Sequence, residues 1–213
     1  MANITVNAER IARNVIVIGA SAGGFEAVRL LLAKLPADLP AFVGIVIHRG
    51  AASKVNWGPI FSRPGKLPVM EPQHAEQLKQ GVVYIAPSDM HMTFDANNVL
   101  LDSSTKQHFT RPAADPLFRS AARAFTTRVI GIVLSGGGRD GVQGLLDITA
   151  AGGLSFVQTP DEAEFKAMPY NALTRDHVHA AMNVSDLADI VPRLVSGDEV
   201  ELHGDVAQVR RHR

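Results

Sequence analysis

Short apolar runs alternate with amphipathic segments along most of the chain. The runs are rich in Val and Ile and almost free of polar residues, which is typical of strands covered on both faces of a parallel sheet. They comprise residues 15–18, 42–47, 67–70, 82–86, 128–134 and 154–158. We therefore predict a mostly parallel β-sheet built from these strands.

The segments between the runs have apolar residues at helical spacing. In the first of them these residues are Phe25, Val28, Leu31, Leu32 and Leu35, and Pro36 ends the helix. Asp115 and Pro116 predict the start of a second helix, with Asp115 as its N-cap. Residues 141–151 and residues 185–194 predict two more helices.

Residues 91–102 predict a β-hairpin that turns near Asn97 and Asn98. Alternation of strands and helices favours a doubly wound architecture over an all-β or all-α fold. The predicted fold class is therefore α/β, with a mostly parallel sheet, helices on both of its faces and an added antiparallel β-hairpin.

The chain has 213 residues, which fits one large domain. We predict that residues 15–195 form this domain. Residues 1–14 form an N-terminal extension and residues 196–213 a polar C-terminal tail, and we expect both to be poorly ordered.

Composition excludes several classes of function. The 21 basic and 21 acidic residues balance, so charge does not indicate a nucleic acid or an anionic membrane as partner. The absence of cysteine excludes disulfides, a thiolate nucleophile and Cys-ligated zinc. No apolar run reaches the ~18 residues of a membrane helix, and the N-terminus lacks the apolar stretch of a signal peptide. We expect a cytoplasmic protein without membrane insertion.

A glycine-rich turn joins the first strand to the first helix. Gly19, Ser21 and Gly23 match G-x-S-x-G, the pattern of a turn that presents a nucleophilic serine. A turn of this kind can also hold the phosphate of a dinucleotide. The motif alone leaves both interpretations open.

Polar residues follow three of the predicted strands. Ser21 follows the first, His48 follows the second, and Asp140 lies in the glycine-rich loop after residues 128–134. The carboxyl ends of parallel strands meet at one edge of a sheet, so these side chains are expected to lie close together. A serine needs an adjacent base to become a nucleophile, and a carboxylate orients the imidazole that serves as this base. Together the three residues predict a catalytic triad.

Two familiar enzyme classes fit poorly. The opening turn is similar to that of short-chain dehydrogenases, which also need a Tyr-x-x-x-Lys pair. Here Tyr84 and Tyr170 are followed four residues on by Ser88 and Thr174. The common α/β-hydrolases place the acid before the histidine, whereas here the histidine comes first.

Histidine and acidic residues also form two short pairs with metal-ligand spacing. His177 with His179, and Asp89 with His91, each lack a third ligand at a telling distance along the chain. The remaining histidines are predicted to be surface residues: His74, His108, His203 and His212. We expect neither a metal nor a cofactor.

The segments around the triad carry a family resemblance over nearly the whole chain. They read, in order, "VIGASAGGFEAVRLLLAKLPADLP", "IVIHRG", "VYIAPSDMHM", "RPAADPLFRSAA", "GIVLSGGGRDGVQGL" and "QTPDEAEFKAMPYNAL". This set closely resembles the catalytic domain of CheB-type chemotaxis methylesterases. The resemblance implies hydrolysis of glutamate γ-methyl esters on the cytoplasmic helices of chemoreceptors, with release of methanol. It also implies that receptor glutamine is a further substrate in some members.

The resemblance assigns roles by position. Ser21 matches the nucleophile, His48 the base and Asp140 the orienting acid. Ala22 and Gly137 fall where the family lines the pocket and supplies oxyanion donors.

Three further positions match conserved-looking segments of the family. Arg111 and Met168 are candidates for substrate binding, with loop anchoring and packing as the alternatives. Asp115 matches the acid of the "RPS-x-D" segment, for which helix capping is the simpler role.

The chain departs from the family pattern beside the triad. Ala22 stands where a small polar residue is usual, Gly137 replaces a methionine, and Arg139 replaces an asparagine and adds a cation near Asp140. These changes keep open a CheB-like binding module with weak or no catalysis, or an esterase for another ester or amide. In the best-known members a receiver domain of roughly 120 residues precedes this domain. We expect this chain to be the catalytic domain without a receiver.

Overall fold

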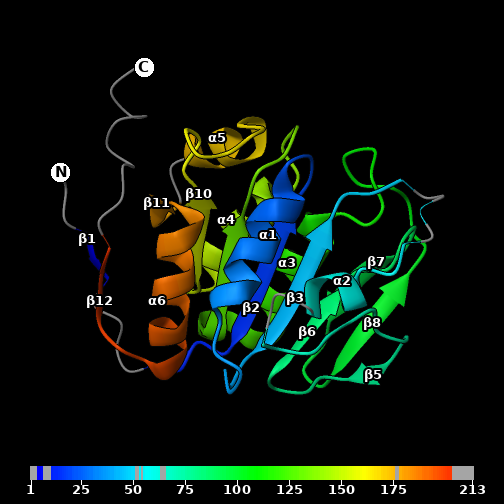
Figure 1. The fold of residues 1–213 in the computed structure, drawn as a ribbon, viewed down its shortest axis with the longest axis horizontal. Helices are drawn as coiled ribbons and strands as arrows, with labels where there is room; N and C mark the ends of the chain where they lie inside the picture. Colours follow the sequence, from blue (N-terminus) through cyan, green and yellow to red (C-terminus); the bar gives the residue numbers. More distant parts are fainter. Residues whose placement is uncertain are drawn as a thin grey trace.

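The computed structural model describes residues 4–6, 11–50, 53, 55–62, 66–175 and 178–202. Its centre is a seven-stranded sheet in the order β11-β10-β9-β2-β3-β6-β4 (Figure 1). Every neighbouring pair in this sheet is parallel. The strands are β2 (Val15–Ala20), β3 (Phe42–Ile47), β4 (Val69–Met70), β6 (Val82–Ile85), β9 (Val129–Val133), β10 (Leu154–Gln158) and β11 (Ala180–Met182). The predicted mostly parallel sheet is confirmed.

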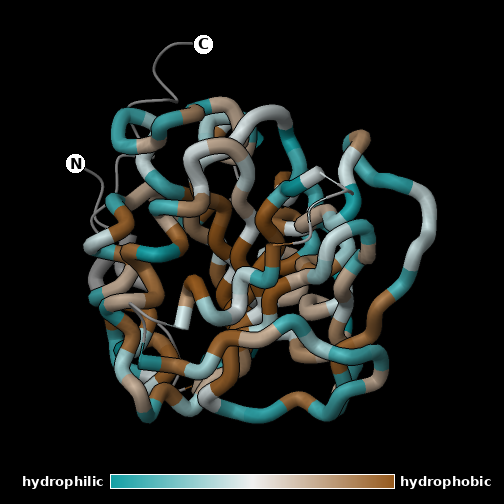
Figure 2. The backbone as a smooth tube through the Cα atoms, turned by 45° about the vertical axis from the view of Figure 1, so that its right-hand side comes forward, coloured by the Kyte–Doolittle hydropathy of each residue, from teal (hydrophilic) through white to brown (hydrophobic). Residues whose placement is uncertain are grey.

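The neighbouring strands β2, β9 and β10 are buried along their whole length. Figure 2 shows the same arrangement as apolar segments gathered inside the molecule, with polar segments around them. Burial on both faces explains why these strands are continuous apolar runs, because neither face of the sheet meets water.

Helices cover both faces of the sheet. α1 (Gly24–Lys34) and α6 (Val184–Ser196) pack on one face, whereas α3 (Ala114–Phe125) and α4 (Val142–Ala150) pack on the other (Figure 1). Gly19 lets α3 approach closely, since a Cβ there would lie 2.7 Å from the Cβ of Ala114. Two short helices, α2 (Gly58–Ser62) and α5 (Ala167–Leu173), and the 3-10 turn η1 (Thr126–Arg128) are the other helical elements of the described residues.

A small antiparallel sheet lies beside α3. It consists of β5 (Glu76–Gln77), β8 (Asn98–Asp102) and β7 (His91–Phe94), in that order. The backbone N–H of Phe94 donates to Ser120 Oγ of α3 at 3.0 Å, which ties the sheet to the helix. The predicted hairpin is thereby confirmed as β7 and β8.

One local expectation is wrong. The N-cap of α3 is Ala113, so Asp115 lies within the first turn of the helix and does not cap it. Met168 lies in α5, next to Pro169, where a proline near the helix start costs no hydrogen bond. β1 (Ile4–Val6) pairs antiparallel with β12 (Val200–Leu202), and the poor order expected of the two end segments stays a prediction. His177, His203 and His212 lie outside the described residues.

After β2 the chain first adds β3 on one side of β2, and later adds β9 on the other side. The carboxyl ends of β2 and β9 therefore flank the point where the winding direction reverses, which is where open α/β sheets form their sites. No helix of the described part of the chain is both long and apolar enough to cross a membrane.

Candidate active site

Ser21 and His48 follow two neighbouring strands at the same edge of the sheet. Ala20 of β2 is in register with Ile47 of β3, and the N–H of His48 donates to the carbonyl of Ala20 at 3.0 Å. Paired strands lie about 4.8 Å apart, so the next residues of both strands, Ser21 and His48, are close neighbours. The sequence-based placement of these two residues agrees with this register.

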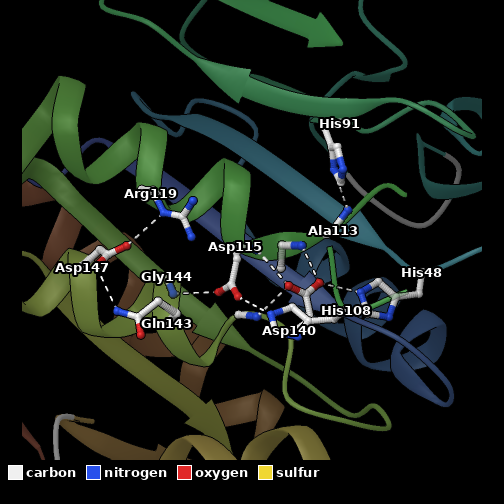
Figure 3. A network of polar contacts seen from close by, with 12 residues as sticks. His48, His91, His108, Ala113, Asp115, Arg119, Asp140, Gln143, Gly144 and Asp147 are labelled. Carbon is white, nitrogen blue, oxygen red and sulfur yellow. Dashed lines mark hydrogen bonds and ion pairs between the residues drawn. The ribbon is translucent and has the colours of Figure 1, made fainter. Parts of the chain in front are cut away.

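His48 contacts Asp140 from the loop after β9. His48 Nε2 lies 2.6 Å from Asp140 Oδ2, and the His48 side chain is 16% exposed (Figure 3). A carboxylate only accepts, so Nε2 carries the hydrogen and Nδ1 of the neutral ring is free to accept a proton. Within the described residues no hydrogen bond joins Ser21 Oγ to His48. Contacts of this kind often tighten only when substrate binds.

Asp140 is buried, with 1% of its side chain exposed, and both of its oxygens are saturated. Oδ2 also accepts the N–H of Ala114 at 2.5 Å, and Oδ1 accepts the N–H groups of Asp115 and Gly141 at 3.0 Å each. Burial favours the neutral acid. The hydrogen bond and charge of His48, together with the backbone donors, outweigh it and hold the pKa of Asp140 below its ordinary value. The carboxylate is thus kept ionised beside the imidazole.

A second carboxylate–histidine pair lies next to this one. Asp115 Oδ2 lies 2.7 Å from His108 Nε2, and Asp115 Oδ1 accepts the N–H of Gly144 in α4 at 2.7 Å. Burial, and then the charge of Asp140, raise the pKa of Asp115. Each acid accepts a backbone N–H from the helix that contains or follows the other acid (Figure 3). Asp140 precedes α4 and accepts an N–H at the start of α3, whereas Asp115 belongs to α3 and accepts an N–H of α4.

His108, Asp115 and Asp140 each offer an atom within 4.8 Å of the others, the separation of a possible metal site. All four carboxylate oxygens already accept from N–H donors of the protein. A metal would have to displace these donors, including the one from His48. The donor set therefore fits a hydrogen-bonded network better than a cation site.

The nucleophile turn is closely packed against the loop after β9. Gly23 has φ 70°, a left-handed conformation that favours glycine, and it is the N-cap of α1. A Cβ on Gly136 would lie 2.8 Å from the Cβ of Ser21 and 2.2 Å from Sδ of Met168. Ser21 is therefore held from the side by the backbone of a neighbouring loop.

Ser135 links three segments around Ser21. Its carbonyl accepts the N–H of Ser21 at 3.0 Å, and its hydroxyl donates to the carbonyl of Ala22 at 2.9 Å. The same hydroxyl accepts the N–H of Phe165 at 3.0 Å, and the Ser135 N–H donates to Gln158 Oε1 at 2.8 Å. Ser135 and Gln158 are both buried. These bonds position the nucleophile turn against the segment that leads into α5.

The two residues predicted to supply oxyanion donors, Ala22 and Gly137, lie in the turns after β2 and β9. Within the described part of the chain, their N–H groups have no acceptor. No side chain or backbone atom lies within 4 Å of a Cβ built on Gly137, so this loop borders open space. Backbone N–H groups without partners beside a serine are suited to binding a developing oxyanion.

Arg111 anchors its own loop. It donates twice to Asp89 Oδ1, at 3.0 and 2.8 Å, and to the carbonyls of Ser103 and Ser104. Asp89 is thus an ion-pair partner of Arg111, and His91 bonds instead to Thr105 and Ala113. The substrate-binding role of Arg111 stays a prediction.

Met168 is fully buried, with its N–H on the carbonyl of Gly136 at 2.9 Å and its side chain against the same glycine. Its substrate-binding role likewise stays a prediction. Arg139 is exposed, and among the described residues it forms no ion pair with Asp140. The departure from the family at Arg139 therefore leaves the carboxylate–imidazole contact intact.

Sequence reasoning gave no role to Ser135 and treated His108 as a surface residue. Ser135 directly follows an apolar strand, the same signal that identified Ser21 and His48. His108 is exposed, but it bonds a buried acid seven residues along the chain. Neither its residue type nor its spacing signalled this contact.

A doubly wound α/β fold with a serine, a histidine and a buried aspartate at one sheet edge is the arrangement of a serine hydrolase. Residues 16–191 match the family CheB methylesterase, and the chain belongs to this family. It is 34% identical over 180 residues to a protein of Leptospira interrogans, covering 84% of this chain and 93% of that one.

Longer relatives and a solved structure agree with this assignment. A protein-glutamate methylesterase/protein-glutamine glutaminase of Ralstonia nicotianae is 34% identical over 91% of this chain, and one of Pyrococcus abyssi is 30% identical over 86%. The chain spans 50% and 51% of the lengths of these two proteins. The crystal structure of the Thermotoga maritima CheB methylesterase catalytic domain superposes with a TM-score of 0.83 at 26% identity, covering 87% of this chain and 100% of that one.

Proposed function

We propose that this chain is a serine carboxyl esterase that hydrolyses glutamate γ-methyl esters on chemoreceptors. The observation that carries the proposal is the 2.6 Å contact between His48 and the buried Asp140. His48 follows β3, the strand paired with β2, which Ser21 follows. The names of the relatives give the substrate class, glutamate esters and glutamine amides of proteins. Deamidation of receptor glutamine is a second proposed reaction of the same site.

The geometry supports a two-step mechanism. His48 Nδ1 takes the proton of Ser21 as its oxygen attacks the ester carbon, and Asp140 stabilises the resulting imidazolium. The oxyanion accepts the N–H groups of Ala22 and Gly137, near the positive end of α1. Collapse expels methanol, which receives the proton from His48. Water, activated by the same base, then attacks the acyl-enzyme, which frees the receptor with a glutamate side chain and restores Ser21.

Release of methanol from a methylated receptor tests this proposal. Ser21→Ala is expected to lower turnover by at least about 10³-fold while the melting temperature stays unchanged, because the hydroxyl is needed only for the chemistry. Ser196→Ala, an exposed serine in α6, is the matched control and is expected to retain turnover. Undiminished methanol release by Ser21→Ala would refute the proposed function. Since the methylated helices of receptors are cytoplasmic in this proposal, we also propose a cytoplasmic location for the enzyme.

The second candidate is a CheB-like binding module. It is favoured by the absence of a Ser21–His48 hydrogen bond within the described residues and by the altered Ala22, Gly137 and Arg139. A fluorophosphonate distinguishes the two, because it labels only an activated serine. Labelling of Ser21 supports the esterase, whereas a folded chain that resists labelling supports the binding module.

A further inference from the structure

The loop between β8 and α3 contains a two-residue turn of unusual composition. Gln107 and Thr110 pair through backbone bonds of 3.1 and 2.9 Å, so His108 and Phe109 are the two residues of the tip. Both have left-handed φ values, 50° for His108 and 65° for Phe109. Turns of this shape favour Asn-Gly, since side chains with a bulky Cβ are strained there. Strain of this kind persists when the surrounding structure enforces it, and it is enriched at functional sites.

The conformation exposes an aromatic ring completely. Phe109 is 98% exposed, the highest value among the large hydrophobic residues that the structure describes as exposed. Burial of the ring elsewhere would relieve this contact with water, so folding alone does not explain its position.

The turn is fixed next to the candidate active site. His108 bonds Asp115, and both have atoms within 4.8 Å of the Asp140 carboxylate (Figure 3). Arg111 clamps the other arm of the loop to Asp89 and to the carbonyl of Ser104. Phe109 therefore belongs to a rigid element beside the acid of the triad.

Other exposed aromatics lie on the nucleophile side of the site. Phe165, 44% exposed, is bonded through its backbone to Ser135 and Gly136, and Tyr170 of α5 is 52% exposed. Figure 1 shows α5 and the loop between β8 and α3 on opposite sides of the edge where β2 and β3 end. The reacting groups thus lie between two regions with exposed aromatic side chains.

We propose that Phe109 is a substrate-docking residue, whose ring packs against an apolar side chain of the protein that carries the ester. The inference rests on the proposed function and extends it to how a protein substrate is recognised. We take a protein substrate as the occupant because the ring is exposed to solvent on a turn whose His108 contacts the Asp115–Asp140 network, so a large surface can meet it while an ester occupies the site. An aromatic anchor on a rigid turn loses little conformational entropy on binding, which is why such residues dominate many interfaces.

The test separates docking from chemistry. Phe109→Gly removes the ring and accepts the left-handed φ without strain, so its melting temperature is expected to equal or exceed that of the wild type. We compare kcat/KM for a methylated receptor fragment with kcat/KM for the small ester p-nitrophenyl acetate. The ratio of the two is expected to fall about tenfold or more, because KM for the receptor fragment rises. Phe109→Leu keeps an apolar side chain and is expected to lose less. Met70→Ala, an exposed apolar residue of β4, is the matched control and leaves the ratio unchanged.

Binding measured without turnover distinguishes the two proposals. In a Ser21→Ala background, adding Phe109→Gly is expected to raise Kd for the methylated receptor fragment about tenfold. If Phe109→Gly changes neither Kd nor the kcat/KM ratio, Phe109 has no docking role. A change in self-association, measured by sedimentation, would not alter this conclusion. If the wild type shows no Ser21-dependent turnover, the proposed function fails, and the change in Kd alone then decides the docking role.

Discussion

The carboxylate of Asp140 contacts His48 Nε2 at 2.6 Å and also accepts the N–H groups of Ala114 and Asp115 at the start of α3. This buried carboxylate therefore orients the candidate base His48 and also caps α3, a helix that lies earlier in the chain. Because capping holds the carboxylate in place, the imidazole contact does not depend on substrate. The same coupling means that a change at this acid is felt in both activity and stability.

Asp140→Asn is expected to lower turnover by about 10⁴-fold, since an amide cannot hold the imidazole in the same tautomer and adds no charge to stabilise the imidazolium. The amide NH₂ also faces donors that it cannot pair with, which is expected to lower the free energy of unfolding by about 1–3 kcal/mol. Methanol release and urea unfolding at neutral pH measure the two effects. Asp147→Asn, a partly exposed acid of α4, is the control and leaves both values nearly unchanged. Turnover by Asp140→Asn at the wild-type rate would exclude the role of the acid.

The two neighbouring acids are expected to affect stability in opposite directions as pH changes. The pKa of Asp140 is lowered by folding, so its contribution is present above the ordinary Asp pKa of about 3.9 and is lost as pH falls through the folded value. The pKa of Asp115 is raised by burial and by Asp140, so its contribution is present below about 3.9 and is lost as pH rises through the folded value.

Urea unfolding across the acidic range checks this with two variants. The stability advantage of the wild type over Asp140→Asn is expected to grow as pH rises to about 5. The difference between the wild type and Asp115→Asn is expected to shift against the wild type over the same rise. Parallel pH profiles for the two variants would contradict the assigned directions.

Sequence patterns predicted the central sheet and the position of three candidate site residues, because both depend on residues that are close together in the sequence. Continuous apolar runs identify buried strands, and parallel strands bring the residues that follow them to one edge. The sequence could therefore place Ser21, His48 and Asp140 at this edge without any knowledge of contacts between them, and their catalytic roles stay a proposal.

The remaining features depend on partners far along the chain. The cap of α3 comes from Asp140, 26 residues after Ala114, so a search for a local cap selected Asp115 instead. His108 reaches Asp115 through a left-handed turn that lacks the usual Asn and Gly. Pairing of β1 with β12 joins the two ends of the chain, and neither segment is long enough to give a period-two pattern.

Ser135 is expected to be a positioning residue for the nucleophile turn. Ser135→Ala removes the acceptor of the Phe165 N–H and the donor to the Ala22 carbonyl, at a buried position. Loss of a buried partner costs about 1–3 kcal/mol of unfolding free energy. Because Ala22 is also a candidate oxyanion residue, kcat is expected to fall more than KM rises. Equal kcat in Ser135→Ala and the wild type, with reduced stability, would limit the residue to a structural role.

The contrast between two adjacent glycines tests how tightly Ser21 is held. Gly136→Ala adds a Cβ that would lie 2.2 Å from Met168 Sδ and 2.8 Å from the Cβ of Ser21, so both must shift. Displacement of a reacting group by about 1 Å can cost 10²-fold in rate, and we expect a loss of at least tenfold in kcat with a lower melting temperature. Gly137→Ala meets no atom within 4 Å and is expected to keep the wild-type melting temperature.

A double variant separates the two contacts of Gly136→Ala. Adding Met168→Ala creates room on the Met168 side alone. Partial recovery of the melting temperature without full recovery of kcat would then identify the contact with Ser21 as the cause of the lost activity. Full recovery of both would instead assign the effect to Met168 alone.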